Sequence, residues 1–150
     1  MTEINFYVSS GSNSAAIYKL LPSLLERMLE QKHKVLIACN DEAEVKRLDK
    51  FLWEHNAEKF LPHGTASQEH AEDQPILITD KDENLNLSDM LICLSGKQVN
   101  DFSSYLKVFD IFEGSEEQKN QGRERWKDYK TKGYQLSYFT SEDGRWTKKM

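Results

Sequence analysis

The strongest chemical pattern in the sequence is a group of cations in a predicted helix over residues 115–132. On a helical projection, one stripe carries only basic residues, namely Lys119, Arg123, Lys127 and Lys130. Trp126 borders this stripe. An arginine holds a carboxylate through two parallel hydrogen bonds, and an apolar group packs against an aromatic ring. The pattern suits a ligand that has both groups, but taken alone it favours a solvated charged face, because isolated surface charge patterns are common.

A second candidate surface surrounds the end of another predicted helix, which runs to about Asn56. Its apolar stripe consists of Val45, Leu48, Phe51 and Leu52. At about 100° per residue, Trp53 lies about 130° from the centre of that stripe, so it is not expected in the core. Phe60 follows in a segment that Pro62 interrupts. These aromatic side chains either pack against a neighbouring loop or form an exposed patch for a partner, and the pattern leaves both open.

Signals for catalysis are weak. The turn over residues 9–14 contains Gly11 but neither a Gly-x-Gly-x-x-Gly nor a Gly-Lys-Ser/Thr motif, so an ordinary turn is favoured over a phosphate site. The four histidines are scattered and are expected on the surface or in loops. Cys39 and Cys93 lie in apolar runs and are expected to be buried thiols. We therefore predict no metal and no cofactor.

The elements that must position these residues follow an α/β pattern, in which short apolar runs alternate with longer periodic segments. We expect helices near residues 14–30, 41–56 and 115–132, with Pro22 kinking the first or moving its start to about Leu21. Strands are expected at residues 4–8, 34–39, 75–79, 90–94, 108–112 and 134–139, and residues 102–106 are ambiguous. A capping box at Ser115 and Gln118 begins the last helix, and Gly133 ends it.

Length, charge and composition argue against several classes of function. The chain has 150 residues and a formal net charge of −5, which argues against a surface that grips a nucleic-acid backbone. This length suffices for one folded domain, residues 1–150, without disulfides. No apolar run approaches the roughly 18 residues of a membrane span, and the start lacks a signal peptide pattern, so a cytoplasmic protein is expected.

Several segments together resemble a known family, the chi subunit of bacterial DNA polymerase III holoenzyme. They occur in the family's order and cover nearly the whole chain, at residues 5–8, 34–42, 47–49, 52–53, 60–63 and 123–129. The resemblance implies a three-layer Rossmann-like α/β fold with a largely parallel central sheet. It also implies a non-catalytic adaptor of the clamp-loader assembly in DNA replication, located at the replisome and contacting DNA only indirectly.

Two partner surfaces are carried over from this resemblance. One faces the psi subunit of DNA polymerase III and comprises Trp53, Phe60, Leu61, Pro62 and His63. The other receives the acidic C-terminal tail of single-stranded DNA-binding protein, which ends in Pro-Phe, and comprises Arg123, Lys127, Trp126 and Phe112. This sequence departs from the family pattern in having Trp126 in place of a tyrosine and Phe112 in place of a smaller aliphatic residue.

Two alternatives remain beside the adaptor. The psi-facing surface can instead accept a helicase of DNA repair, as the resemblance allows. A small enzyme that binds a nucleotide at the turn over residues 9–14 ranks far behind, because no catalytic group accompanies that turn.

Overall fold

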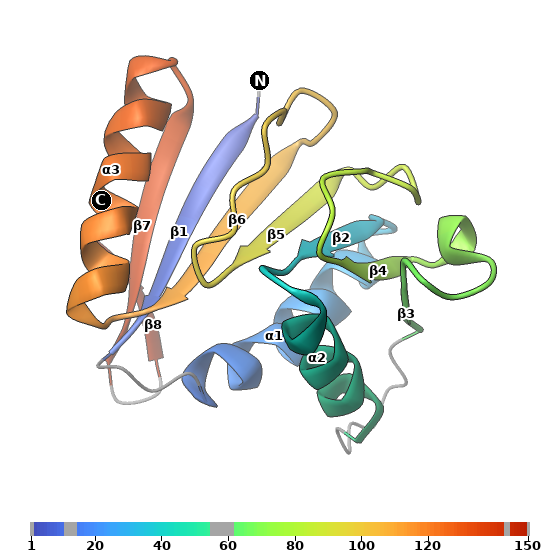
Figure 1. The fold of residues 1–150 in the computed structure, drawn as a ribbon. Helices are drawn as coiled ribbons and strands as arrows, with labels where there is room; N and C mark the ends of the chain where they lie inside the picture. The colour runs from blue at the N-terminus through green and yellow to red at the C-terminus, as the bar shows by residue number, and fades with distance from the viewer. Residues whose placement is uncertain (1, 11–14, 55–61, 143–144, 150) are drawn as a thin grey trace.

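A single mixed sheet organises the protein, which we describe from a computed structural model covering residues 2–10, 15–54, 62–142 and 145–149 (Figure 1). Its helices are α1 (Ala15–Glu30), α2 (Glu42–Glu54) and α3 (Glu116–Thr131), with a 3-10 turn at Ala71–Asp73. Its strands are β1 (Glu3–Ser9), β2 (Val35–Ala38), β3 (Gly64–Thr65), β4 (Ile76–Thr79), β5 (Met90–Leu94), β6 (Lys107–Glu113), β7 (Gln135–Glu142) and β8 (Arg145–Lys148). The predicted α/β class is confirmed.

The strands follow the order β3-β4-β2-β5-β6-β1-β7-β8, and all neighbouring pairs are parallel except β7 and β8. Helices α1 and α2 cover one face, and α3 covers the other at the β6-β1-β7 end (Figure 1). This is the three-layer, largely parallel arrangement that the family resemblance implies. Among the described helices, none has the length and apolar character to cross a membrane.

Successive side chains of a strand point to opposite faces of the sheet, so the buried residues form two cores, one on each face. Val35 and Ile37 of β2 face α1 and α2, whereas Leu36 and Ala38 face the opposite side. Both sets are buried, because parallel sheets are covered on both faces. The two cysteines belong to these cores, as predicted.

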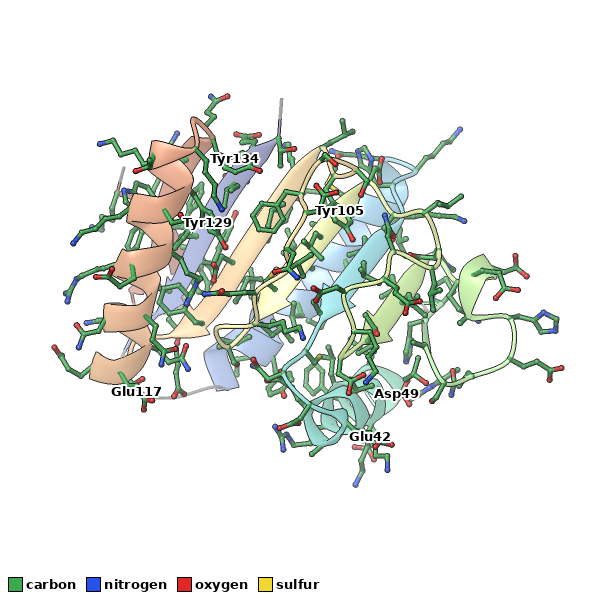
Figure 2. The ribbon with its side chains drawn as sticks, turned by 45° about the horizontal axis from the view of Figure 1, so that its top comes forward. Glu42, Asp49, Tyr105, Glu117, Tyr129 and Tyr134 are labelled. Atoms are coloured by element: carbon green, nitrogen blue, oxygen red, sulfur yellow. The ribbon has the colours of Figure 1, made fainter. Side chains whose placement is uncertain are left out.

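Residues 102–106 form part of a loop that covers the second face rather than a strand. Phe102 and Tyr105 are buried there, and the Thr2 hydroxyl donates a hydrogen bond to the Tyr105 carbonyl oxygen at 2.8 Å. Figure 2 shows Tyr105 from this loop and Tyr129 from α3 over the same side of the sheet. The loop therefore fills the space that α3 leaves uncovered.

Three local expectations need correction. Helix α1 continues through Pro22 and does not begin at Leu21. Strand β8 returns antiparallel to β7, a hairpin that the sequence pattern did not reveal. Strand β3 adds a two-residue edge at Gly64–Thr65, where the sequence pattern predicted no strand.

Candidate functional site: an aromatic and cationic pocket beside α3

Helix α3 is fixed at both ends by local hydrogen bonds. The Ser115 hydroxyl accepts a hydrogen bond from the backbone N–H of Gln118 at 3.3 Å. This is the first of the two reciprocal hydrogen bonds that define the predicted capping box. At the other end Gly133 has a φ of +88°, a conformation that favours glycine, and its N–H bonds to the Lys130 carbonyl oxygen. The helix thus begins and ends where the sequence predicted, within one residue.

Three residues of α3 face the sheet: Gly122, Arg125 and Tyr129 are all buried. Arg125 makes a bidentate pair with Asp110 of β6, with Nε to Oδ2 at 2.8 Å and Nη2 to Oδ1 at 2.9 Å. Burial raises the pKa of the Asp110 carboxyl, and the bonds from Arg125 act against that rise. This buried ion pair holds the middle of the helix against β6.

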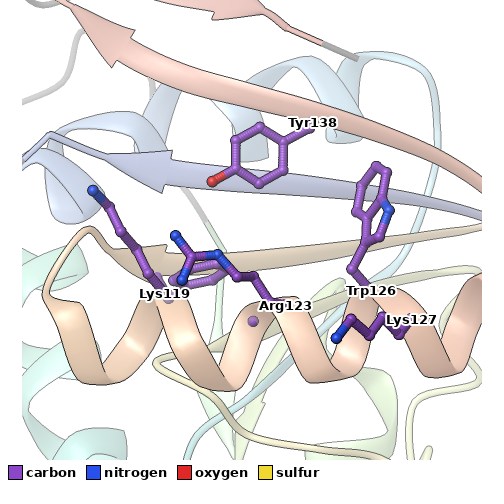
Figure 3. Close-up of a pocket in the computed structure, with 7 residues that line it drawn as sticks. Lys119, Arg123, Trp126, Lys127 and Tyr138 are labelled. Carbon is purple, nitrogen blue, oxygen red and sulfur yellow. The ribbon is translucent and has the colours of Figure 1, made fainter.

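A pocket of about 390 Å³ opens between α3 and β7. Its lining residues come from β6, α3 and β7 and are Phe112, Lys119, Gly122, Arg123, Trp126, Lys127 and Tyr138. Figure 3 shows Tyr138 across from the helix, with Lys119 and Arg123 reaching toward it and the Trp126 ring standing beside it. The pocket therefore has an aromatic wall and a cationic rim.

The aromatic wall is held by edge-to-face contacts. Trp126 meets Tyr138 with 5.9 Å between ring centroids at 79°, and it meets Phe6 at 5.2 Å and 82°. Burial raises the pKa of Tyr138, and the charge of Arg123 opposes this rise. The wall thus presents neutral rings to a bound group.

The rim carries three positive charges and, among its lining residues, no carboxylate. Arg123 Nη1 donates to the Asn120 Oδ1 at 2.8 Å, and Lys127 Nζ lies 3.8 Å from Glu124 Oε1. Both partners are exposed and such surface pairs are weak, so an incoming carboxylate can replace them. The arrangement suits an anionic ligand with an apolar end.

The second surface lies at the opposite end of the sheet, where α2 packs near β3 and β4. Trp53 is 56% exposed in the last turn of α2, as its position off the apolar stripe predicted. Its ring lies 4.7 Å from that of His63, centroid to centroid, and His63 Nε2 lies 3.3 Å from Asp49 Oδ1. His63 lies in the loop before β3, as one of the two expectations for the histidines allowed, but its side chain is only 1% exposed and so is not on the surface.

Comparison with known proteins now identifies the family. Residues 1–137 match the family described as DNA polymerase III chi subunit, HolC. The chain belongs to this chi family. It is 29% identical to DNA polymerase III subunit chi of Haemophilus influenzae over 88% of this chain and 92% of that protein. It is 28% identical to the subunit of the same name from Escherichia coli, over 93% of this chain and 99% of that protein.

The protein is therefore an accessory subunit of DNA polymerase III in DNA replication, as the sequence resemblance implied. Within this chi-family chain, the fold brings all four residues predicted for the tail surface to one pocket: Phe112, Arg123, Trp126 and Lys127. Of the residues predicted to face psi, Trp53 is exposed, Pro62 is half-buried and His63 is buried. Phe60 and Leu61 lie outside the described residues, as do residues 11–14 of the predicted turn.

Three pocket residues were not predicted as site residues. Lys119 and Lys130 both belong to the cationic stripe, but of these two only Lys119 lines the pocket. Gly122 is buried on the sheet side of α3, and nothing in the sequence pattern marked it as pocket lining. Tyr138 comes from β7, and its alternation with Phe139 along that strand could have suggested that it faces α3.

Neither described cysteine has the environment of a nucleophile. Burial raises the pKa of both Cys39 and Cys93, so neither thiol forms the thiolate that a nucleophile requires. The exposed group of His70, Glu72 and Asp73 lies on one short turn and has no neighbouring pocket among those described.

Proposed function

We propose that this chain is an adaptor that joins the clamp-loader assembly, through the psi subunit, to the C-terminal tail of single-stranded DNA-binding protein. In this role it works through protein contacts and catalyses no reaction itself. The observation that carries the proposal is the α3 pocket, which combines three aromatic rings with three cations and no lining carboxylate.

The chemistry of the pocket matches a peptide that ends in phenylalanine. The terminal ring packs against the wall that Trp126 and Tyr138 form, and Arg123 binds the terminal carboxylate through its guanidinium. Acidic residues further along the tail meet Lys119 and Lys127 at the rim. A local group of cations attracts such a tail even though the whole chain carries a net charge of −5.

Calorimetric titration with an acidic peptide ending in Pro-Phe tests this assignment. We expect saturable binding that weakens with salt and is lost when the terminal phenylalanine is removed. Arg123→Ala should cost about 1–2 kcal/mol of binding free energy, because the guanidinium is exposed at the rim before it binds.

Lys130→Ala is the matched control, since Lys130 belongs to the same cationic stripe of α3 but does not line the pocket. If Lys130→Ala weakens binding as much as Arg123→Ala, the interaction is diffuse attraction to a charged helix. If the unaltered chain does not bind at low salt, the tail assignment is wrong.

The psi-facing role falls to the surface around Trp53. An exposed indole at the end of a helix is an anchor of the kind that protein interfaces use. Trp53→Ala should weaken binding to the psi subunit and leave tail binding unchanged. Leu106→Ala is the control, because Leu106 is 58% exposed, as Trp53 is 56% exposed, but it lies in the loop before β6. Equal psi affinity of both variants would contradict this assignment.

A further inference from the structure

Gly122 allows an unusually close approach between α3 and the ring of Phe112. A Cβ atom placed on Gly122 would lie 2.6 Å from Phe112 Cζ, 3.1 Å from Cε2 and 3.3 Å from Cε1. A contact below 3.0 Å requires one of the two groups to move. Glycine is also the least favourable ordinary residue inside a helix, and here it stands in the middle of α3. The space that a side chain at position 122 would occupy is thus taken by the tip of Phe112.

Phe112 also packs against two other side chains, Arg125 of α3 and Phe6 of β1. The Arg125 guanidinium lies 5.1 Å from its ring centroid, and Arg125 is itself held by Asp110. Phe6 packs against Phe112 edge to face, with 6.1 Å between ring centroids. The Phe112 side chain is only 1% exposed, yet it lines the pocket as its floor. The floor of the pocket is therefore a buried ring packed between the sheet and the helix.

We propose that Phe112 and Gly122 form a matched pair that sets the depth of the α3 pocket and thereby selects the size of the last side chain of a bound peptide. This inference rests on the proposed function. The Phe112 ring limits how far a terminal side chain can descend along the wall formed by Trp126 and Tyr138. A phenyl group fits this depth, whereas the longer indole group of tryptophan meets the floor before its carboxylate reaches Arg123.

Two acidic peptides that differ only in their last residue, phenylalanine or tryptophan, test the selection. The unaltered chain is expected to bind the phenylalanine peptide at least about tenfold more tightly. Phe112→Leu removes the tip of the ring and deepens the pocket, so this preference should fall to about threefold or less. Phe102→Leu is the matched control, since Phe102 is a buried ring of the same core that does not line the pocket.

The pairing itself is tested by a double-mutant cycle. Gly122→Ala adds a methyl group where the Phe112 tip lies, so affinity for the phenylalanine peptide should fall at least about tenfold. Phe112→Leu makes room for that methyl group, and the double variant should regain most of the lost affinity. Thermal unfolding of each variant checks that the chain is folded.

The outcomes separate this inference from the proposed function. If the unaltered chain binds neither peptide, both are wrong. If it binds the phenylalanine peptide but a folded Gly122→Ala variant binds equally well, the matched pair is wrong and the adaptor role stands. If Phe112→Leu does not fold, the Gly122→Ala variant alone gives this decision.

Discussion

The imidazole of His63 lies under the exposed indole of Trp53, with 4.7 Å between the ring centroids and 49° between the planes. His63 is buried beside Asp49 and packs against Trp53. Under the proposed role of Trp53 in binding the psi subunit, His63 is therefore a positioning residue and not a direct contact.

His63→Ala should weaken binding to the psi subunit even though the side chain is buried, because the Trp53 ring loses its support. Aromatic contacts of this kind contribute about 0.5–1.5 kcal/mol, and we expect a loss of this order. Titration of the variant with psi measures it, and the tail peptide serves as the control ligand. Unchanged psi affinity in a folded His63→Ala variant would show that Trp53 needs no support.

Tyr138→Ala should weaken binding of the tail peptide by about 0.5–1.5 kcal/mol, because it removes the wall that faces Trp126. Tyr138→Phe keeps the ring and should retain most of the affinity. Tyr134→Ala is the control, since this half-exposed ring contacts Phe102 and Tyr129 and lies outside the pocket lining. Calorimetry with one peptide compares all three, and a larger effect at Tyr134 would contradict the assignment.

Asp110→Asn should lower the free energy of unfolding by about 3–5 kcal/mol, because it leaves the Arg125 charge buried without its counter-charge. The double change Asp110→Leu with Arg125→Met removes both charges and should cost less. Urea denaturation at neutral pH measures both. If the double variant is less stable than Asp110→Asn, the geometry of the pair matters more than its charge balance.

The raised pKa of Tyr105 predicts that the free energy of unfolding falls at high pH. Burial raises its pKa to about 12, whereas an unfolded tyrosine has a pKa of about 10. The folded state therefore favours the neutral phenol, and its contribution is complete below about pH 10 and is lost as the pH rises toward about 12. Tyr105→Phe should reduce the fall in unfolding free energy over this range, measured by urea denaturation at a series of pH values. An unchanged slope would show that other groups dominate alkaline unfolding.

Much of this fold could be predicted because local sequence patterns, such as apolar runs and helix caps, mark its elements. The buried runs at 76–79 and 90–94 are apolar on both faces, as parallel strands require, and the cap at Ser115 marks the start of α3 within one residue. Strand β8 escaped prediction because it is an edge strand whose pattern, Arg145–Lys148, is mostly polar. Its assignment depends on pairing with β7, which no local rule contains.

The candidate site divides in the same way. Arg123, Trp126 and Lys127 share one helix, so helical periodicity alone brings them together. Tyr138 joins them only because β7 lies beside β1, and the role of Gly122 depends on how deeply Phe112 reaches from β6. The buried pair of Asp110 and Arg125 was also missed, since an isolated acid in a strand gives no sign of its partner fifteen residues later.

The order of the strands also has a mechanical consequence. Four strands separate β4, beside α2, from β7, which carries Tyr138. At about 4.8 Å between neighbours, the two proposed binding surfaces are separated across the sheet by about 24 Å. A force that pulls two bound partners apart would act across the strands. Each pair of neighbouring strands between β4 and β7 would then carry the whole force through its hydrogen bonds. The ladders of β2 with β4 and with β5 have four residue pairs each, fewer than the others on this path. These two strand pairs would therefore separate first and would set the force at which the sheet between the two surfaces ruptures.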